Sequence, residues 1–410
     1  MASEEVQVDY TLANPDTLTK YKQAGAISQK VLEAVKELCT DGAKIVEICE
    51  KGDKLLEDEI AKVYKGKKIT KGIAHPTTVS PSSYVTPYTP LKTDADEAET
   101  TIKNGEIVKI QLGAQIDGLG TIVCDSIVVG GEITGRAADL LLATHYANEL
   151  LLRLLLPPGT LATTEEEKKK AESQKPPSQG KINQLLEVVA KSYDTTLVES
   201  TTSWLFERNE IEGKKKIILA PGEGVKGEGV PEVGDVWGIE TGLSLGGGKV
   251  KTVSNRATLH RRTTTTYILK RPSSRATLSE IVKKFGTFPF SLRQLEDERA
   301  AKVGVVECVS RNVLRQYEVV ADKEGEPVSR LFTTVVQAIT KNGVVRLAGP
   351  PTLDLEKVKS DKKITDEDVL KILELPLAKT STKSASKNKK KKKKPAKKAA
   401  ETTEEEESDE

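Results

Sequence analysis

Residues 108–129, VKIQLGAQIDGLGTIVCDSIVV, hold side chains at a spacing that bears on metal chemistry. Apolar residues alternate on both sides of Asp117-Gly118, which predicts two antiparallel strands joined by a two-residue turn. In that register, positions 111 and 122 are diagonal neighbours on one face of the hairpin. Two carboxylates so placed can bind divalent cations. The sequence instead has Gln111, a neutral amide, and Ile122, which offers no ligand.

The other polar residues of the hairpin cannot replace such a pair. Asp117 belongs to the turn, and Asp125 faces away from position 122 in the predicted register. The cysteines of the chain lie far apart and form no C-x-x-C pair; they are Cys39, Cys49, Cys124 and Cys308. We therefore expect neither a disulfide framework nor a thiolate zinc site, and a reducing compartment is favoured.

The remaining candidate groups indicate no other enzyme class. The histidines are His75, His145 and His260. We interpret His145 as a structural residue of a Leu-rich helix and His75 as a residue of loop packing. The glycine-rich stretch GEGVKGEG lacks the Lys-Ser/Thr pair of a phosphate-binding loop, and the sequence contains no G-x-S-x-G motif.

A mixed set of helices and strands must position these groups. Asn14 and Pro15 are typical of a helix start, and the apolar spacing that follows predicts a helix over residues 14–40. A second helix is expected over residues 45–63. Residues 70–93 hold four prolines and many hydroxyl groups, which indicates loop and edge-strand structure.

Further helices are predicted in the later part of the chain. The Leu-rich run over residues 134–156 is interrupted by polar side chains, so we expect a core helix rather than a membrane span. Two capping boxes, Thr277 with Glu280 and Ser291 with Gln294, predict two helix starts. The pattern as a whole indicates a mixed α/β protein with one large domain.

The composition of the C-terminal residues predicts a charged tail after this domain. The chain has 410 residues and a formal net charge of +2, but the sum hides a basic block at 387–398 and an acidic block at 401–410. Residues beyond 378 have too few apolar side chains to offset the entropy of ordering, so we expect disorder there. The N-terminus lacks the apolar segment of a secretory signal.

Five segments of the sequence resemble one protein family. They are YKQAGAISQKVLEAV, GIAHPT, TGRAADLLLATHYANELLLRLL, EVGDVWGIET and FPFSLRQLEDERAAKVGVVECV. Together they are similar to the proliferation-associated, curved-DNA-binding proteins, a non-peptidase branch of the type-two methionine aminopeptidases. The resemblance implies an α+β, pita-bread fold with two pseudo-symmetric halves, each with helices packed on antiparallel sheet.

The resemblance also implies domain boundaries. Residues 14–350 would form the pita-bread domain, with a charged insertion near 160–180 and an inserted segment near 211–275. Residues 351–378 would be a C-terminal extension, and residues 379–410 a disordered tail that is first basic and then acidic.

In active relatives, a pocket between the halves holds two divalent metals. The ligands are two Asp, one His and two Glu, with a further catalytic His nearby. Carried over position by position, the resemblance retains one metal ligand, Glu240. The other ligand positions fall on Gln111, Ile122, Trp204 and Phe332, and the catalytic His position falls on Pro87. A single carboxylate binds a hard cation weakly. The resemblance therefore implies no metal, no cofactor and no catalysis, with Glu240 left as a hydrogen-bonding core residue.

Charge is the second functional signal of the sequence. The basic block contains nine lysines, with Lys389, Lys390, Lys391, Lys392, Lys393 and Lys394 as its continuous core. Three basic clusters lie in the folded part: Lys214, Lys215 and Lys216; Arg261 and Arg262; Lys270 and Arg271. We expect these residues to contact phosphates, which gives affinity with little sequence specificity. The low aromatic content favours structured RNA over base stacking.

The combined interpretation is a catalytically inactive aminopeptidase homologue that binds structured RNA, with curved DNA as a further ligand. As the resemblance implies, its partners would be ribosomal RNA and the large ribosomal subunit, in ribosome biogenesis, translation or growth control. We expect a monomer without a membrane partner, located in the cytoplasm and the nucleus, including the nucleolus. Two alternatives stay open: a metal-dependent aminopeptidase with rearranged ligands, and a protein-protein adaptor that uses the old substrate pocket.

Overall fold

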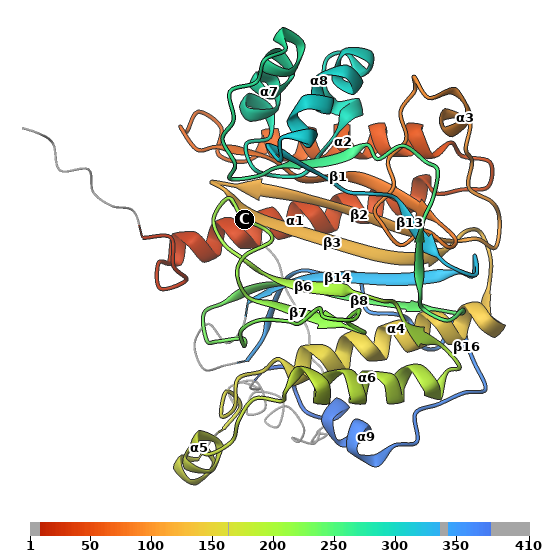
Figure 1. Cartoon of the computed structure of the whole chain (residues 1–410). Helices are drawn as coiled ribbons and strands as arrows, with labels where there is room; N and C mark the ends of the chain where they lie inside the picture. Colours follow the sequence, from red (N-terminus) through yellow and green to blue (C-terminus); the bar gives the residue numbers. More distant parts are fainter. Residues whose placement is uncertain (1–8, 163, 337–342, 379–410) are drawn as a thin grey trace, which may run out of the picture. The chain divides into compact units, whose positions relative to one another are not determined.

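An antiparallel sheet forms the centre of the fold (Figure 1). The computed structural model describes residues 9–162, 164–336 and 343–378, and over those residues the sheet has nine strands. Its main path is β1 (Lys71–Pro81), β2 (Ile107–Ile116), β3 (Leu119–Val128), β14 (Val328–Val336), β8 (Val236–Ser244), β6 (Thr201–Phe206) and β7 (Lys216–Leu219). Two short strands complete it, β15 (Val345–Ala348) on β14 and β5 (Thr196–Leu197) on β8. The central β3–β14 pair joins two halves of the sheet that are far apart in the sequence.

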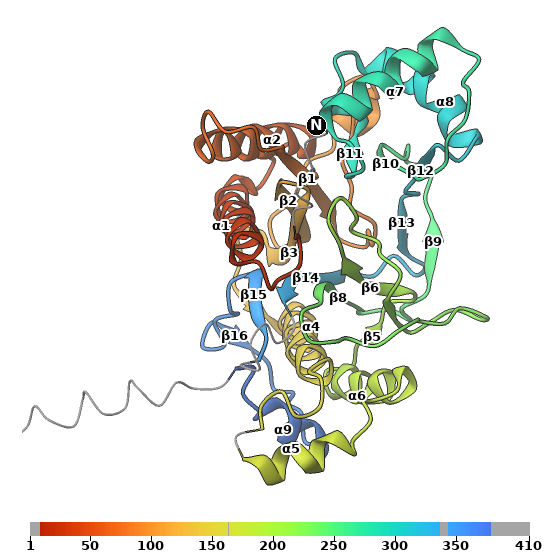
Figure 2. The ribbon, with the colours of Figure 1, turned by 90° about the vertical axis from the view of Figure 1, so that its left-hand side faces the viewer.

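Each half of the sheet carries its own helices. α1 (Pro15–Leu38) and α2 (Ile45–Lys62) pack on β1, β2 and β3, whereas α4 (Gly135–Leu154) packs on β8 and β14, with α6 (Gln179–Ser192) beside it. Figure 2 shows the two helix layers against the two halves of the sheet. This arrangement confirms the expected α+β, pita-bread architecture.

A smaller module stands over the opposite face of the sheet (Figure 2). Its strands are β9 (Val250–Thr252), β10 (Leu259–Arg262), β11 (Phe290–Ser291), β12 (Leu314–Gln316) and β13 (Val320–Asp322). Its helices are α7 (Pro272–Lys284), the 3₁₀ turn η1 (Leu292–Gln294) and α8 (Glu298–Ser310). The module has an apolar cluster of its own, built around Ile281, Phe290 and Cys308.

The remaining elements are short. They are α3 (Ala95–Ala98), α5 (Glu165–Glu172), α9 (Glu367–Leu373), β4 (Ile133–Thr134) and β16 (Val358–Lys359). Residues of the segment that follows β15 reach the main core, because Ile364 and Val369 are buried against the α4 layer. No helix among residues 9–162, 164–336 and 343–378 is long and apolar enough to cross a membrane.

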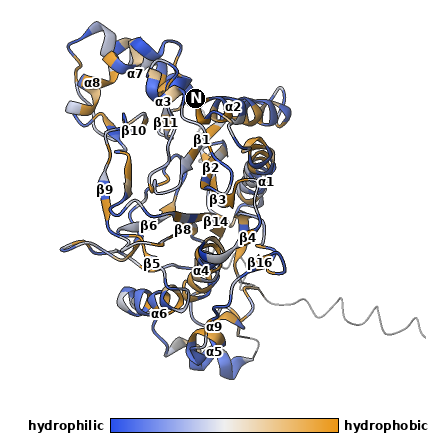
Figure 3. Ribbon diagram, turned by 90° about the vertical axis from the view of Figure 1, so that its right-hand side faces the viewer, coloured by the Kyte–Doolittle hydropathy of each residue, from blue (hydrophilic) through white to orange (hydrophobic). Residues whose placement is uncertain are grey.

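Apolar side chains explain where the helices lie. Figure 3 shows hydrophobic residues on the strands and on the helix sides that face them. Val31, Leu32 and Val35 of α1 are almost fully buried over the first half of the sheet, and Leu150 and Leu151 of α4 over the second. Burying such side chains stabilises the fold by about 1.5–3 kcal/mol each, which fixes the helix positions more strongly than local propensity does.

The capping residues in the sequence predict some of the helix starts correctly. The Asn14 side chain accepts a hydrogen bond from the backbone of Asp16 and Pro15 opens α1, as predicted. The Ser291–Gln294 capping box is present but opens only the 3₁₀ turn η1. The predicted start at Thr277 is wrong. α7 begins at Pro272, whose fixed φ suits a first helical position, so Thr277 lies inside the helix and is buried. The expected disorder beyond residue 378 lies outside the described residues.

Candidate functional site: a buried arginine in a pocket

The β2–β3 hairpin has the register that the sequence predicts. Gln111 pairs with Cys124 and Gly113 pairs with Ile122, so Gln111 and Ile122 lie diagonally on one face. Asp117 has a φ of +59° in the turn. Its carboxylate forms salt bridges with Lys20 at 2.7 Å and with Arg208 at 2.9 Å. Asp117 therefore fixes the turn and takes no part in the pocket.

A row of paired residues crosses the middle of the sheet. Gln111 pairs with Cys124, Cys124 with Phe332 on β14, and Phe332 with Glu240 on β8. Directly paired residues of antiparallel strands share a face, so Gln111, Phe332 and Glu240 point the same way. They face the small module and line a pocket of about 420 Å³.

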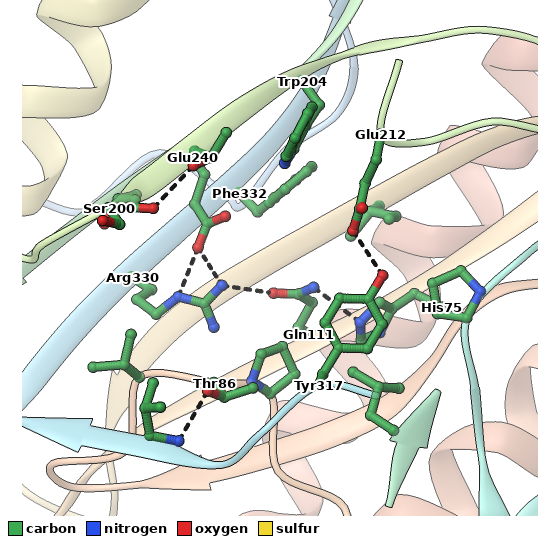
Figure 4. Close-up of a pocket in the computed structure, with 18 of the residues that line it drawn as sticks. His75, Thr86, Gln111, Ser200, Trp204, Glu212, Glu240, Tyr317, Arg330 and Phe332 are labelled. Atoms are coloured by element: carbon green, nitrogen blue, oxygen red, sulfur yellow. Dashed lines mark hydrogen bonds and ion pairs between the residues drawn. The ribbon is translucent and has the colours of Figure 1, made fainter. Parts of the chain in front are cut away.

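The six positions carried over from the family resemblance all lie in this one pocket. Gln111, Ile122, Trp204, Glu240, Phe332 and Pro87 are among its lining residues. Figure 4 shows Trp204, Phe332 and Glu240 on one side and Gln111 with His75 on the other. The fold thus brings residues that are far apart in the chain into one pocket.

Arg330 is the central charged residue of the pocket, and the sequence reasoning missed it. It lies two residues before Phe332 on β14, and it is 4% exposed. Its Nε donates to Glu240 Oε1 at 2.8 Å, and its Nη2 donates to the same oxygen and to Gln111 Oε1 at 3.3 Å. Burial opposes its charge, but the field of Glu240 outweighs burial and raises the pKa of Arg330. The guanidinium stays charged and links the two sides of the pocket (Figure 4).

His75 extends this network at the β1 edge. Its Nε2 lies 3.1 Å from Gln111 Nε2, and its Nδ1 lies 2.8 Å from the carbonyl oxygen of Pro76. The imidazole therefore accepts from Gln111 and donates to Pro76. Burial lowers the pKa of His75 to about 4, so the ring is neutral near pH 7. The interpretation of His75 as loop packing is wrong, because β1 carries it into the pocket wall.

The rest of the pocket is apolar on one side and ion-paired on the other. Trp204, Phe206 and Phe332 form an aromatic wall, with 6.2 Å between the ring centroids of Phe206 and Phe332. Across from it, Tyr317 donates to Glu212 at 2.6 Å, and Glu212 also pairs with arginines of the small module.

The residues present do not fit a pair of divalent cations. Of the six carried-over positions, Glu240 alone offers a carboxylate, and that carboxylate is bound to Arg330. Gln111 is neutral and already engaged on both ends of its amide. Over the described residues, no group of three or more His, Cys, Asp or Glu side chains is arranged to hold a metal ion. Such sites need several oxygen or nitrogen ligands, so we derive no chemical step through a metal here.

The other histidines lie away from this pocket. His145 is on α4, on the far side of the central sheet, and lines a different cavity. His260 is on β10 and fully buried, and its Nδ1 lies 3.1 Å from the carbonyl oxygen of Thr258.

The basic clusters of the sequence differ in how their charges are used. Lys215 pairs with Glu232 at 3.2 Å and Asp235 at 2.9 Å. Lys216 lies over the Trp204 ring, whereas Lys214 is exposed. Arg261 is 8% exposed and pairs with Glu210 and Glu212, so its guanidinium is not free for a phosphate.

The third cluster belongs to a surface that we call the cationic tip: Arg262, Lys270, Arg271, Arg275 and Arg311. Lys270 and Arg271 are exposed. None of the five side chains forms a salt bridge with the part of the chain that the structure describes. Arg311 lies over the Tyr267 ring, 5.0 Å from its centroid, and the neighbouring Ile268 is 90% exposed. Lys389, Lys390, Lys391, Lys392, Lys393 and Lys394 lie outside the described residues.

The chain is similar to known proteins in both sequence and structure. Residues 19–168 match metallopeptidase family M24. The curved DNA-binding protein of Schizosaccharomyces pombe is 39% identical over 393 residues, which cover 94% of this chain and 97% of that protein. A solved structure of a thermophilic Arx1 is 66% identical and covers 89% of this chain and 100% of its own, with a TM-score of 0.87.

A more distant structure matches in fold alone. The methionine aminopeptidase from Thermotoga maritima is 16% identical and covers 82% of this chain and 97% of its own, with a TM-score of 0.50. The fold class expected from the sequence is thereby confirmed.

Proposed function

Because the chain belongs to metallopeptidase family M24, in the group of the curved DNA-binding and proliferation-associated proteins, we propose that it is a catalytically inactive member that binds nucleic acid and ribosomal particles. Structured RNA is the main ligand in this proposal and curved DNA a further one. The protein would act as a monomer in ribosome biogenesis, translation or growth control, in the cytoplasm and the nucleus.

The observation that carries the proposal is the guanidinium of Arg330 bound between Glu240 and Gln111. This group supplies the positive charge that metal ions supply in an M24 peptidase, but it cannot activate a water molecule for attack. A dication about 4 Å from a guanidinium would meet a repulsion on the order of 8 kcal/mol at an effective dielectric constant of about 20. Arg330 therefore both occupies the centre and opposes metal binding.

The cationic tip supports the nucleic-acid part of the proposal. Glu307 of α8 accepts the backbone N–H groups of Lys270 and Arg271 at 2.8 and 3.0 Å, and it forms no salt bridge with the five side chains of the tip. Positive charge without a carboxylate partner suits phosphates, which accept hydrogen bonds from Arg and Lys. The lysines of the basic block would add further phosphate affinity that does not depend on the nucleic-acid sequence.

A salt titration tests this proposal. Binding of a structured ribosomal RNA fragment would be measured for the full chain, for a variant that lacks residues 379–410, and for Lys270→Gln/Arg271→Gln/Arg275→Gln/Arg311→Gln. We expect each change to reduce affinity at least about tenfold near 0.1 M salt and to flatten the dependence of log K on log salt.

The matched control removes four charges elsewhere. Lys181→Gln/Lys191→Gln/Lys357→Gln/Lys371→Gln changes exposed lysines on α6, α9 and the C-terminal extension. We expect this variant to bind almost as tightly as the unchanged protein. Equal losses in the two quadruple variants would mean that total charge, rather than the cationic tip, decides binding, and no binding at low salt would contradict the proposal.

The pocket itself favours a second function, that of an adaptor. Its aromatic wall of Trp204, Phe206 and Phe332 is open to a ligand, although the metal ligands are missing. Such a wall suits an apolar side chain at a peptide end. Nuclease-resistant capture of a peptide, lost in Trp204→Ala but kept in the cationic-tip variant, would support this function over RNA binding.

A further inference from the structure

A second cavity lies on the other face of the central sheet. It has a volume of about 360 Å³ and is bounded by β3, β14, α1, α4 and residues 350–354. Figure 2 shows β15 between α1 and α4, the two helices that bound the cavity. Side chains alternate along β14: Arg330 and Phe332 line the first pocket, whereas Ser329 and Leu331 line the second. The proposed function makes no use of this second cavity.

Two buried polar side chains of this cavity each have an atom with no hydrogen-bond partner among the described residues. Asn148 is 3% exposed and its Oδ1 is unpaired, and Ser329 is 0% exposed with an unpaired Oγ. His145 precedes Asn148 by three residues on α4, so both side chains lie on the helix face turned to the cavity. Buried polar groups in proteins are nearly always hydrogen-bonded, so two such groups in one cavity point to a ligand that supplies their partners.

The charged groups of the cavity do not call for a charged ligand. Lys36 pairs with Asp125 at 2.9 Å. Glu149 pairs with Arg153 at 2.8 Å and also with Arg346. Because these charges are balanced within the protein, an added ion would have to break an existing pair. A neutral ligand carries no such cost.

The other walls set the size and nature of the ligand. Ile127 and Leu331 come from the sheet and Leu141 from the facing helix, with Pro350 and Pro351 at the side. The volume lies at the small end of the usual range for ligand pockets, about 300–1,000 Å³. Apolar walls on the sheet side and on the helix side suit a flat ring of one or two cycles.

We propose that this cavity binds a small uncharged heteroaromatic molecule whose edge carries a hydrogen-bond donor next to an acceptor. The side-chain amide of Asn148 offers the complementary acceptor and donor, a pairing that asparagine makes with adenine. Ser329 and His145 each supply a further donor or acceptor. The aminopyrimidine edge of adenine and the carboxamide of nicotinamide share the required chemistry.

Direct titration tests the proposal. The full-length protein would be titrated with adenine, with nicotinamide and with indole, by ligand-observed saturation-transfer NMR. Indole is a flat ring of similar size that lacks the adjacent acceptor. We expect adenine or nicotinamide to bind saturably with a dissociation constant below about 1 mM, and indole to bind much more weakly. The probe that binds shows whether the cavity takes the aminopyrimidine edge of adenine or the carboxamide of nicotinamide.

Two variants and a control locate the binding. Asn148→Leu removes the amide, and we expect it to weaken binding at least about tenfold. Should Asn148→Leu fail to fold, Ser329→Ala removes one hydroxyl and should weaken binding several-fold. Gln184→Leu, on the exposed face of α6, should leave binding unchanged.

Several results would overturn the proposal. They are the absence of saturable binding by either probe, indole binding as tight as that of the others, and unchanged affinity in the folded cavity variants. RNA binding by the cationic tip does not involve this cavity, so failure of either proposal leaves the other standing.

Discussion

The arginine of the pocket and the arginines of the cationic tip differ in what surrounds them. Arg330 is buried and bound to Glu240 and Gln111. Arg271 and Arg311 lie at the surface and form no salt bridge with the described residues. The charge of Arg330 is paired inside the protein, whereas the charges of Arg271 and Arg311 have no carboxylate partner among the described residues. The comparison shows that the partner of a charge, rather than the charge itself, decides its role.

The strongest test of this comparison removes the buried charge. Arg330→Met would leave Glu240 without its cation in a buried site, and we expect the free energy of unfolding to fall by about 3–5 kcal/mol. Urea unfolding would measure the change. The double variant Arg330→Met/Glu240→Leu should recover much of this loss, because it leaves no unpaired charge. A single variant as stable as the unchanged protein would mean that the Arg330–Glu240 pair is solvated.

A second test concerns the neutral end of the same network. Burial lowers the pKa of His75 to about 4, whereas the unfolded value is near 6.5. The unfolded chain therefore binds a proton first as pH falls through 6.5, and stability is lost progressively down to about pH 4. Between pH 7.5 and pH 5 this amounts to about 2 kcal/mol.

Comparison with His75→Gln isolates this contribution, because every other titrating group is shared. We expect the variant to lose about 2 kcal/mol less than the unchanged protein between the two pH values, as measured by urea unfolding at each pH. Parallel pH dependences would show that His75 titrates normally and that the pocket wall admits water.

The smallest effect is expected at the surface. Arg311→Met removes a charge that has no acidic partner in the part of the chain that the structure describes, so the free energy of unfolding should change by no more than about 0.5 kcal/mol. The same variant should weaken RNA binding a few-fold, because one phosphate contact is lost. A large decrease in the free energy of unfolding would mean that the fold requires the charge of Arg311, as it requires that of Arg330.

Local patterns predicted what depends on neighbours in the chain. The register of the hairpin followed from alternation around Asp117-Gly118, and the start of α1 followed from Asn14 and Pro15. The convergence of Trp204, Phe332 and the other pocket positions came from the family resemblance, since no local pattern connects them.

What the sequence did not reveal depends on pairs far apart in the chain. Arg330 and Glu240 are 90 residues apart, and their salt bridge exists because β14 and β8 are adjacent. The alternation of β14 was a usable signal, since Arg330 must share a face with Phe332. The sequence predicts Arg261 as a phosphate-binding surface residue, but the fold buries it against acids of the β6–β7 connection.

The alternation along β14 also limits how this protein can diverge. The strand serves two unrelated cavities at once, with odd-numbered positions on one side and even-numbered positions on the other. Insertion or deletion of a single residue would exchange the two sets, sending a guanidinium toward α4 and a hydroxyl toward Glu240. Single residues of β14 can therefore be replaced in evolution one at a time. A change in the length of the strand would disrupt both cavities together.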